Sequence, residues 1–266
     1  MDEAELVRAF YNRDARMEWG RLDRHPVEFA VTKRYLERYI QPRMRVLDIG
    51  GGPGRYALYL AQRGCDVTLL ELAEANVDFA RARAAELALP LRALQGDARE
   101  ADRLVEGPFD AVLLMGPLYH LLAPEQRARA VRAALGLLRP GGLLFAAFIS
   151  LNAGMIYYLK EAPEDVMLPA EQAYIRCFLR GETYAGDAFT KACFIAPREI
   201  VPFMEGLGLV TLHLFGQEGI TAPNEANVNA CGAAALERWI ELALATCERE
   251  EYRALSEHLM YVGRKP

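Results

Sequence analysis

Four glycines and a proline directly follow a short apolar run in segment 45–56, which reads Arg-Val-Leu-Asp-Ile-Gly-Gly-Gly-Pro-Gly-Arg-Tyr. An apolar run that stops at glycine and proline is typical of a buried strand that enters a tight turn. Glycine reaches backbone angles that other residues avoid, and it lets a ligand approach the main chain. Apolar residues return at helical spacing at Tyr56, Ala57 and Leu60. Strand, turn and helix N-terminus together predict a site of the nucleotide-binding type.

The spacing of these glycines separates two classes of ligand. The dinucleotide pattern is Gly-x-Gly-x-x-Gly, whereas the glycines here stand at 50, 52 and 54, and position 55 is Arg. The third glycine of the dinucleotide pattern is therefore missing. Preceded by Val-Leu-Asp, the spacing resembles motif I of the class I S-adenosylmethionine-dependent methyltransferases. A structural glycine turn in another α/β protein is the alternative.

Composition limits the class of protein. A chain of 266 residues, 52% of them hydrophobic, suffices for one sizeable core with an insertion. The net charge of −5 does not indicate nucleic-acid binding. No apolar run approaches the roughly 20 residues that span a bilayer, and the acidic N-terminus does not resemble a signal peptide. The five scattered cysteines favour reduced thiols. We expect a cytoplasmic monomer or homodimer without a membrane segment or a metal.

The order of predicted elements indicates the fold class. Two helices, 5–19 and 27–40, precede the glycine turn, and strands then alternate with helices. The expected strands are 66–71, 91–95, 110–115, 143–149, 209–215 and 258–262. The expected helices are 75–87, one that begins at Pro124, one that begins at Pro197, and 233–255; residues 138–142 read as a turn. This succession predicts a doubly wound, mostly parallel sheet.

The alternation of strands and helices stops at residue 150. Residues 151–194 contain seven tyrosines or phenylalanines and more acidic than basic side chains. We expect a mostly apolar cap over the substrate there, helical at least over 170–180. Three parts are predicted: an N-terminal helical cap segment (1–44), a core (45–150 and 195–266) and the insertion (151–194). The core resembles the seven-stranded Rossmann-like methyltransferase fold, in which the last strand is inserted antiparallel.

The resemblance assigns roles to two acidic residues. In the family, an acidic residue at the end of the second strand binds both ribose hydroxyls. Glu71 holds that place in Leu69-Leu70-Glu71-Leu72, and a carboxylate accepts two hydrogen bonds at once. The alternative is an exposed acid at a strand end. An acidic residue after the third strand reaches the adenine amino group in the family, and Gly96-Asp97-Ala98 stands in that place.

The family's pattern implies a full set of cofactor residues. Asp48 is typically buried beneath the turn, where it binds loop amides and faces the ammonium group of the ligand; a purely structural role is equally open. In many relatives the N-terminal segment folds over the cofactor, so Tyr11, Trp19 and His25 are further candidates for the site. The predicted set for S-adenosylmethionine is Asp48, Gly50, Gly51, Gly52, Gly54, Glu71, Leu72, Asp97, Ala98, Met115, Gly116 and Tyr11.

The end of the fourth strand, Leu114-Met115-Gly116-Pro117-Leu118-Tyr119-His120-Leu121, should line the pocket for methyl transfer. It carries neither the Asp/Asn-Pro-Pro-Tyr/Phe motif of DNA amino-methyltransferases nor the Pro-Cys of cytosine-C5 enzymes. It therefore resembles the small-molecule branch, often called type 11. His120 is the candidate general base, because its intrinsic pKa suits proton transfer. Tyr119 is a candidate for orienting the substrate, and packing is the alternative for both residues.

Four functions remain open at this stage. The first is methyl transfer to nitrogen, oxygen or sulfur of a small molecule. The second is methylation of RNA or protein, and the acidic charge counts against RNA. The third is a nonenzymatic protein that uses the fold for binding, since fold does not fix function. A dehydrogenase is disfavoured by Arg55. His213 and His258 fall in predicted strands and read as core or edge residues.

Overall fold

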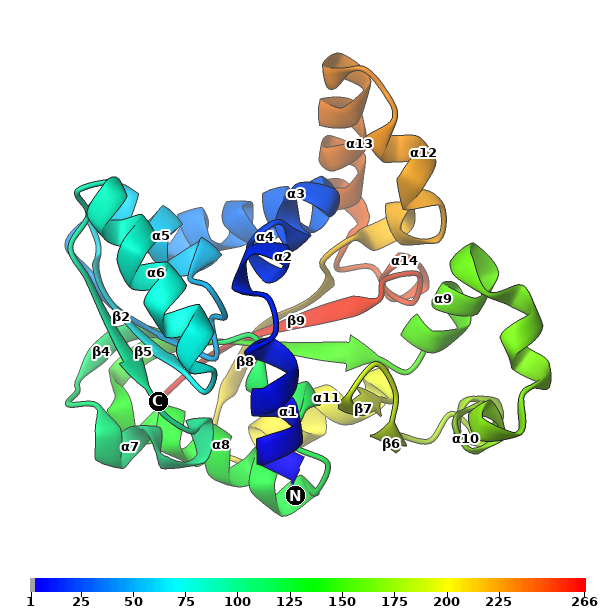
Figure 1. Ribbon diagram of the computed structural model, residues 1–266, viewed down its shortest axis with the longest axis horizontal. Coiled ribbons are helices and arrows are strands. Elements are labelled where there is room, and N and C mark those ends of the chain that lie inside the picture. Colours follow the sequence, from blue (N-terminus) through cyan, green and yellow to red (C-terminus); the bar gives the residue numbers. More distant parts are fainter. Residues whose placement is uncertain (1–2) are drawn as a thin grey trace.

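A twisted sheet crosses the centre of the molecule, which the computed structural model describes for residues 3–266 (Figure 1). Seven strands run in the order β3-β2-β1-β4-β5-β9-β8. Neighbours from β3 to β5 are parallel, and β9 is antiparallel to both of its neighbours. The seven-stranded methyltransferase sheet is therefore confirmed. The strands are β1 (Arg45–Ile49), β2 (Asp66–Glu71), β3 (Leu91–Gln95), β4 (Phe109–Leu114), β5 (Leu138–Ser150), β8 (Val210–Gly216) and β9 (His258–Arg264).

The insertion adds two further strands to this sheet. β6 (Tyr184–Asp187) and β7 (Lys191–Ile195) form an antiparallel hairpin, and β7 pairs with the end of β5 at Ile149 and Ser150. Helices α9 (Ala153–Glu161) and α10 (Gln172–Arg180) of the insertion lie beside this hairpin, away from the rest of the sheet (Figure 1). The helix expected over 170–180 corresponds to α10.

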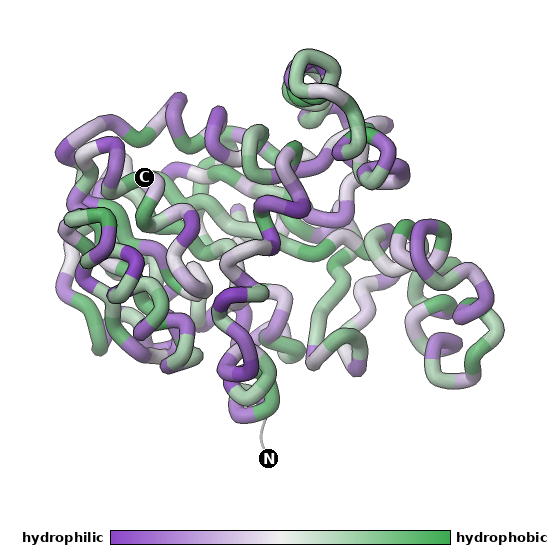
Figure 2. Tube along the Cα trace, turned by 45° about the horizontal axis from the view of Figure 1, so that its top comes forward, coloured by the Kyte–Doolittle hydropathy of each residue, from purple (hydrophilic) through white to green (hydrophobic). Residues whose placement is uncertain are grey.

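Helices cover both faces of the sheet. Val46 and Leu47, neighbours in β1, belong to opposite core clusters, because side chains alternate along a strand. Helices α4, α5, α6 and α13 cover one face, and α7, α8 and α11 cover the other. The central strands are mostly hydrophobic along the chain (Figure 2). The α-helices are α1 (Glu3–Tyr11), α2 (Ala15–Trp19), α3 (Arg21–Arg24), α4 (Pro26–Tyr39), α5 (Arg55–Gln62), α6 (Glu74–Glu86), α7 (Ala101–Leu104), α8 (Pro124–Leu137), α9 (Ala153–Glu161), α10 (Gln172–Arg180), α11 (Pro197–Glu205), α12 (Glu225–Asn229), α13 (Ala233–Thr246) and α14 (Glu250–Arg253).

The described residues also form the 3₁₀ helices η1 (Ala98–Glu100), η2 (Pro117–Tyr119), η3 (Pro163–Met167), η4 (Pro169–Glu171) and η5 (Gly219–Asn224). η1 and η2 follow β3 and β4 directly. Within residues 3–266, no helix has the length and apolar character needed to cross a membrane.

The N-terminal segment differs from its prediction in two ways. The single helix expected over 5–19 is divided, because the Asp14 carboxylate accepts the amides of Arg16 and Met17, both at 3.0 Å, and so begins a second helix. The helix α4 is buried in the main core, with Val27 and Val31 fully inaccessible. We expected the whole segment 1–44 to form a cap. Because α4 belongs to the core, only residues 3–25 of the described chain can cover a site.

Two later predictions also fail at their ends. The helix expected over 233–255 ends at Thr246, because the carbonyl of Cys247 accepts the amide of Gly216 at the end of β8 instead of a helical amide. The turn expected over 138–142 is part of β5. There, the carbonyl of Gly142 accepts the amide of Lys265, and the amide of Gly141 donates to the carbonyl of Lys265.

Candidate active site

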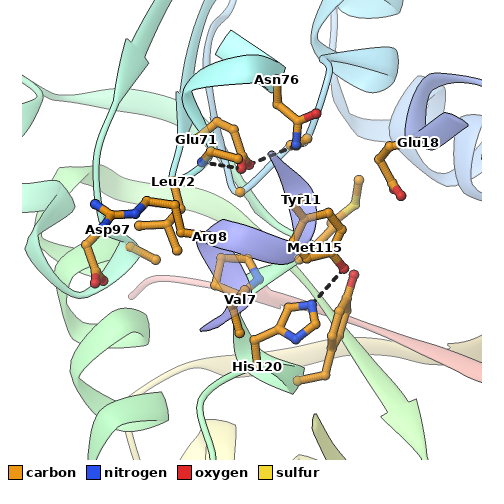
Figure 3. A pocket seen from close by; sticks show the side chains of 18 of the residues that line it. Val7, Arg8, Tyr11, Glu18, Glu71, Leu72, Asn76, Asp97, Met115 and His120 are labelled. Carbon is orange, nitrogen blue, oxygen red and sulfur yellow. Dashed lines mark hydrogen bonds between the residues drawn. The ribbon is translucent and has the colours of Figure 1, made fainter. Parts of the chain in front are cut away.

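A pocket lies above the carboxyl ends of β1, β2 and β4, where the glycine turn begins (Figure 3). The parallel register places Asp48 beside Leu69, so the turn after β1 and the acid at the end of β2 meet at one edge. Of the predicted cofactor and catalytic residues, all but Gly54 line this pocket. Gly54 has φ of +86° and is the N-cap of α5. Gly54 therefore has a structural role: its left-handed backbone conformation lets the chain turn from the loop into α5.

Close packing of main chain explains the glycines of the turn. Gly50 and Gly52 have φ of +68° and +57°, which other residues rarely adopt. A Cβ on Gly50 would lie 2.5 Å from the Pro117 ring, and one on Gly51 would lie under 3.0 Å from the Asp48 carboxylate. A Cβ on Gly116 would overlap the carbonyl of Gly50. The turn and the loop after β4 therefore pack against each other directly.

Glu71 ties the glycine turn to the end of β2. One carboxylate oxygen accepts the Gly52 amide at 3.0 Å, and the other accepts the Ala73 amide at 2.9 Å. The carboxylate is buried, and burial raises its pKa. Each oxygen keeps a second lone pair for a ligand hydroxyl. Its place and chemistry fit the predicted contact with a ribose, which stays a prediction.

Three buried polar side chains of the pocket lining, those of Asp48, Asn76 and Tyr56, have no partner of normal hydrogen-bond geometry among the described residues. Two of them, the carboxylate of Asp48 and the amide of Asn76, are fully inaccessible. Burial and the nearby charge of Glu71 raise the pKa of Asp48 to about 7, and the Ala57 amide opposes the shift. Asp48 does not bind the loop amides as expected. Unpartnered buried polar groups are costly, so both side chains fit a site completed by a polar ligand.

Asn76 was not predicted. It lies in the first turn of α6, directly above the end of β2, and its neighbour Val77 belongs to the core. The sequence signal was available: the helix that follows β2 begins at the edge where ligands of α/β sheets bind. A polar residue next to a core position in that turn is a candidate for contact with a ligand.

Asp97 lies at the far end of the pocket, and Arg99 holds it. Its carboxylate accepts the Arg99 amide at 2.8 Å, and it accepts both Nε, at 3.0 and 3.1 Å, and Nη2, at 2.5 Å, of the same side chain. Although burial opposes the shift, these bonds lower the pKa of Asp97. The carboxylate is therefore ionised, and Arg99 fixes its direction. Contact with an adenine amino group stays a prediction.

His120 connects three parts of the chain. Its Nδ1 lies 3.0 Å from the carbonyl of Lys191 in β7, and its Nε2 lies 2.8 Å from the Tyr11 hydroxyl of α1. Because a carbonyl only accepts, Nδ1 carries the proton and Nε2 accepts the hydroxyl of Tyr11. Burial lowers the pKa of His120 to about 4, and the Lys191 carbonyl opposes the shift. His120 is therefore neutral at pH 7, with both ring nitrogens engaged.

Helix α1 lies across the pocket. Val7, Arg8 and Tyr11 extend between Glu71 and His120 (Figure 3). The remaining cavity is about 150 Å³, below the roughly 300–1,000 Å³ of typical small-molecule sites. Phe10 of α1 also meets Phe189 of the insertion, with ring centroids 6.1 Å apart. We infer that α1 moves when a ligand the size of a nucleoside binds.

The other candidates lie outside this pocket. Trp19 packs beside Phe79 of α6, and Arg55 of α5 lies over its ring. His25 pairs with Glu225 at 2.9 Å. The Nε2 atom of His213 lies at hydrogen-bond distance, 2.5 Å, from the Tyr39 hydroxyl, and its Nδ1 atom lies 3.0 Å from a carboxylate oxygen of Glu248. Each of these three side chains contacts a neighbouring residue, and none lines this pocket.

Comparisons with known proteins agree with this geometry. A family profile described as "Methyltransferase domain" matches residues 46–142. The chain is 36% identical over 152 residues to a ubiquinone biosynthesis O-methyltransferase of Methylocella silvestris, covering 54% of this chain and 52% of the relative. It is 32% identical over 179 residues to the enzyme of the same description from Chromobacterium violaceum, covering 66% and 70%. This chain belongs to the S-adenosylmethionine-dependent methyltransferases.

Solved structures share the fold. The magnesium protoporphyrin IX methyltransferase of Synechocystis, with bound S-adenosylhomocysteine, has a TM-score of 0.61 at 13% identity, covering 100% of both chains. The 1,6-didemethyltoxoflavin-N1-methyltransferase of Burkholderia thailandensis has a TM-score of 0.60 at 18% identity, covering 98% and 88%. A [4+2]-cyclase has a TM-score of 0.56 at 19% identity, covering 96% and 85%. The fold alone therefore does not fix the reaction. The first two curated relatives are matched over 52% and 60% of their length.

Proposed function

We propose that this protein transfers the methyl group of S-adenosylmethionine to a nitrogen, oxygen or sulfur atom of a small molecule. One observation carries the proposal. The glycine turn, Glu71 and two unpartnered buried side chains, Asp48 and Asn76, converge on one pocket. A second cavity of about 630 Å³ adjoins it, and Tyr11, Glu18, Arg21 and Tyr119 line both.

The chain's own residues would bind and orient the reactants. The glycine turn admits the cofactor close to the main chain, Glu71 and Asn76 offer groups for its hydroxyls, and Asp48 offers a carboxylate to its ammonium group. S-adenosylmethionine supplies an already activated methyl group on a sulfonium. The protein mainly has to position the acceptor and exclude water. The cover of α1 and the insertion supports that role.

A small acceptor fits better than RNA or protein. The second cavity lies between the N-terminal segment, the end of β5 and the insertion, and its lining includes Glu18, Asp165, Glu171, Asp187 and Glu257. Such a lining is unfavourable for a phosphate backbone. The curated relatives are named O-methyltransferases of ubiquinone biosynthesis, which supports a small-molecule acceptor. A cytoplasmic location and a monomer or homodimer stay predictions from sequence.

Turnover tests the proposal directly. The protein should form S-adenosylhomocysteine from S-adenosylmethionine when a panel of aromatic amines, phenols and thiols is supplied, as measured by mass spectrometry of both products. A methylated product must appear in step with S-adenosylhomocysteine. Binding of the cofactor without turnover on any member of a broad panel would instead favour a binding protein or another reaction on this fold.

We expect hydrogen exchange to slow in residues 8–26 and 151–194 when cofactor and acceptor bind together. Both segments contact the pockets, and covering segments are mobile by necessity. Exchange measured by mass spectrometry, with cofactor alone as the control, separates the two steps. Protection confined to residues 45–120, even with a true acceptor present, would show that these segments are not a lid.

We expect His120→Ala to leave turnover of the bound complex nearly intact and to weaken cofactor binding or folding. The reason is that Nε2 already accepts the Tyr11 hydroxyl and a pKa of about 4 leaves little affinity for a proton near pH 7. A single-turnover assay with saturating cofactor separates the two effects. A loss of about 10²–10⁴-fold that follows an ionisation near pH 6–7 would identify a general base instead.

The same histidine gives a stability prediction. Its pKa is about 4 in the folded protein and roughly 6.5 in the unfolded chain. The unfolded chain therefore binds the extra proton between these values, and stability is lost as pH falls from about 6.5 to about 4. In urea unfolding, the free energy of unfolding of the wild type should fall more over this range than that of His120→Ala. Parallel curves would contradict the assigned protonation.

A further inference from the structure

The second cavity has the size of a small-molecule site. Its volume is about 630 Å³, within the roughly 300–1,000 Å³ of such sites. It opens beside the candidate cofactor pocket at Glu18 and Arg21, which line both. A molecule bound there would lie next to the place proposed for the cofactor. The lining therefore reports on the chemistry of the acceptor.

Aromatic rings form its walls from two directions. Phe10, Tyr11 and Tyr119 come from α1 and the loop after β4, while Tyr157 and Phe189 come from the insertion. Tyr158, Tyr174, Tyr184 and Phe194 also line the cavity, and their rings pack on each other. Flat ring faces suit a planar ligand, and their negative faces attract cations.

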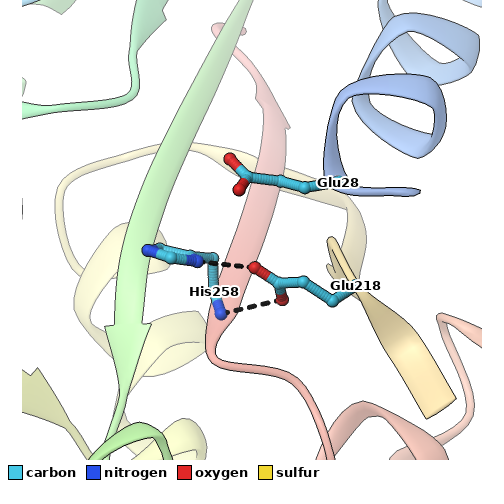
Figure 4. Close-up of side chains that lie close together, drawn as sticks. All are labelled: Glu28, Glu218 and His258. Atoms are coloured by element: carbon cyan, nitrogen blue, oxygen red, sulfur yellow. Dashed lines mark hydrogen bonds and ion pairs between the residues drawn. The ribbon is translucent and has the colours of Figure 1, made fainter. Parts of the chain in front are cut away.

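The buried cations beside this cavity are already neutralised. The Arg21 guanidinium donates to both oxygens of Glu28, at 2.8 and 2.6 Å, which helps to hold the pKa of Glu28 near about 2 against burial. His258 pairs with Glu218 at 2.6 Å (Figure 4). Although burial opposes it, this pairing raises the pKa of His258 to about 9. Ligand atoms of Glu28, Glu218 and His258 lie within 4.8 Å of one another, but their charges are satisfied by these pairs, and we assign no metal.

The nearby lysines are neutralised too. Lys160 lies 2.9 Å from Glu257 and 3.6 Å from Glu225. Lys191 pairs with Asp187. These cations therefore offer little attraction for an anionic ligand.

Three acidic side chains of the lining are not fully neutralised in this way. Glu18 shares its cation with Glu28: it pairs with Nε of Arg21 at 3.7 Å, whereas Glu28 accepts two shorter bonds from the same guanidinium, so one negative charge is left in excess. For Asp165 and Glu171, no ion pair is found among residues 3–266; the Glu171 carboxylate accepts the hydroxyl of Tyr158. Glu18 lies over the glycine turn, 3.7 Å from where a Cβ of Gly52 would be. It is thus the acid of this group placed where the two cavities meet.

We infer that the second cavity binds a planar aromatic molecule that carries a positive charge, and that Glu18 pairs with this charge. The inference rests on the proposed function, because it takes this molecule to be the acceptor bound beside the cofactor. A protonated amine on an aromatic ring system would contact the rings and pair with the Glu18 carboxylate, which Arg21 neutralises only in part. An aromatic carboxylate or phosphate would meet the same rings, but each cation described above is already paired with a carboxylate.

Two probes of equal ring system and opposite charge test the inference. Tryptamine and indole-3-acetate are titrated calorimetrically into wild-type protein saturated with S-adenosylhomocysteine. Tryptamine should bind at least about tenfold more tightly, the scale of a partly buried ion pair with a cation–π contact. Glu18→Gln should bring the two affinities within about threefold of each other. Glu18→Asp keeps the charge and should keep the preference, and Glu250→Gln, on α14 outside both cavities, should change nothing.

Several outcomes of these titrations would overturn the inference. Equal or tighter binding of indole-3-acetate, or no binding of tryptamine, overturns the inference, and so does a preference that survives Glu18→Gln. Thermal unfolding of each variant shows whether it folds, and Glu18→Ala, with the same expected loss of preference, replaces Glu18→Gln if that variant does not fold. Binding of S-adenosylhomocysteine is measured first, without either probe. If S-adenosylhomocysteine does not bind, the proposed function fails. If it binds and the charge preference is absent, only the acceptor class fails.

Discussion

Replacing Glu71 by alanine is expected to weaken binding of S-adenosylhomocysteine by about 1.5–3 kcal/mol, the range for a hydrogen bond to a charged group. The carboxylate is buried at the pocket floor and accepts the amides of Gly52 and Ala73. Its loss removes the proposed acceptor for ribose hydroxyls and frees the glycine turn. Isothermal calorimetry on the purified variant measures the change, which corresponds to a loss of roughly 10–150-fold.

Glu74→Ala is the matched control for this experiment. Glu74 begins α6 three residues later, its side chain is exposed, and it does not line the pocket. Its removal takes away the same charge near the same strand end. Equal losses in the two variants would mean that Glu71 acts only through its charge at long range, and an unchanged affinity in Glu71→Ala would remove it from the site.

Gly51→Ala is expected to weaken S-adenosylhomocysteine binding by about 1–3 kcal/mol, the usual cost of forcing an extra carbon into a packed site. The added carbon would lie under 3.0 Å from the Asp48 carboxylate. Asp48 is fully buried beneath the turn, so the turn has to shift and its amides leave their places. Calorimetry measures the loss of affinity, and thermal unfolding shows how much of the cost falls on folding.

Gly232→Ala is the control for the added carbon. At Gly232, φ is −64°, and a Cβ would meet nothing within 4 Å. The same chemical change should therefore leave cofactor affinity unchanged. If Gly51→Ala binds the cofactor as tightly as Gly232→Ala, the close contact of the turn with Asp48 has no role in shaping the site.

Local patterns predicted the sheet well because each strand carries its own signal. β2 and β3 have the ranges that the sequence predicted, and the glycine spacing at 50, 52 and 54 located the pocket. Boundaries failed where a contact distant in sequence decides them. The end of α13 depends on the bond between the carbonyl of Cys247 and the amide of Gly216, and no local pattern contains that bond.

Partners within the site were least predictable. Asp97 was expected to face a ligand, but Arg99, two residues further on, binds its carboxylate. His120 was a candidate base from its place after β4, and its bonds to Tyr11 and Lys191 appear only once α1 and the insertion fold over it. The second cavity combines side chains from four distant segments, so no spacing in the sequence reveals its charge.

A calorimetric titration of the wild-type protein with S-adenosylhomocysteine, and in parallel with NAD, tests the central claim most directly. The glycine spacing, Glu71 and the unpartnered Asp48 and Asn76 predict that S-adenosylhomocysteine binds at one site per chain and that NAD does not bind. Tight binding of NAD with no binding of S-adenosylhomocysteine would contradict the account.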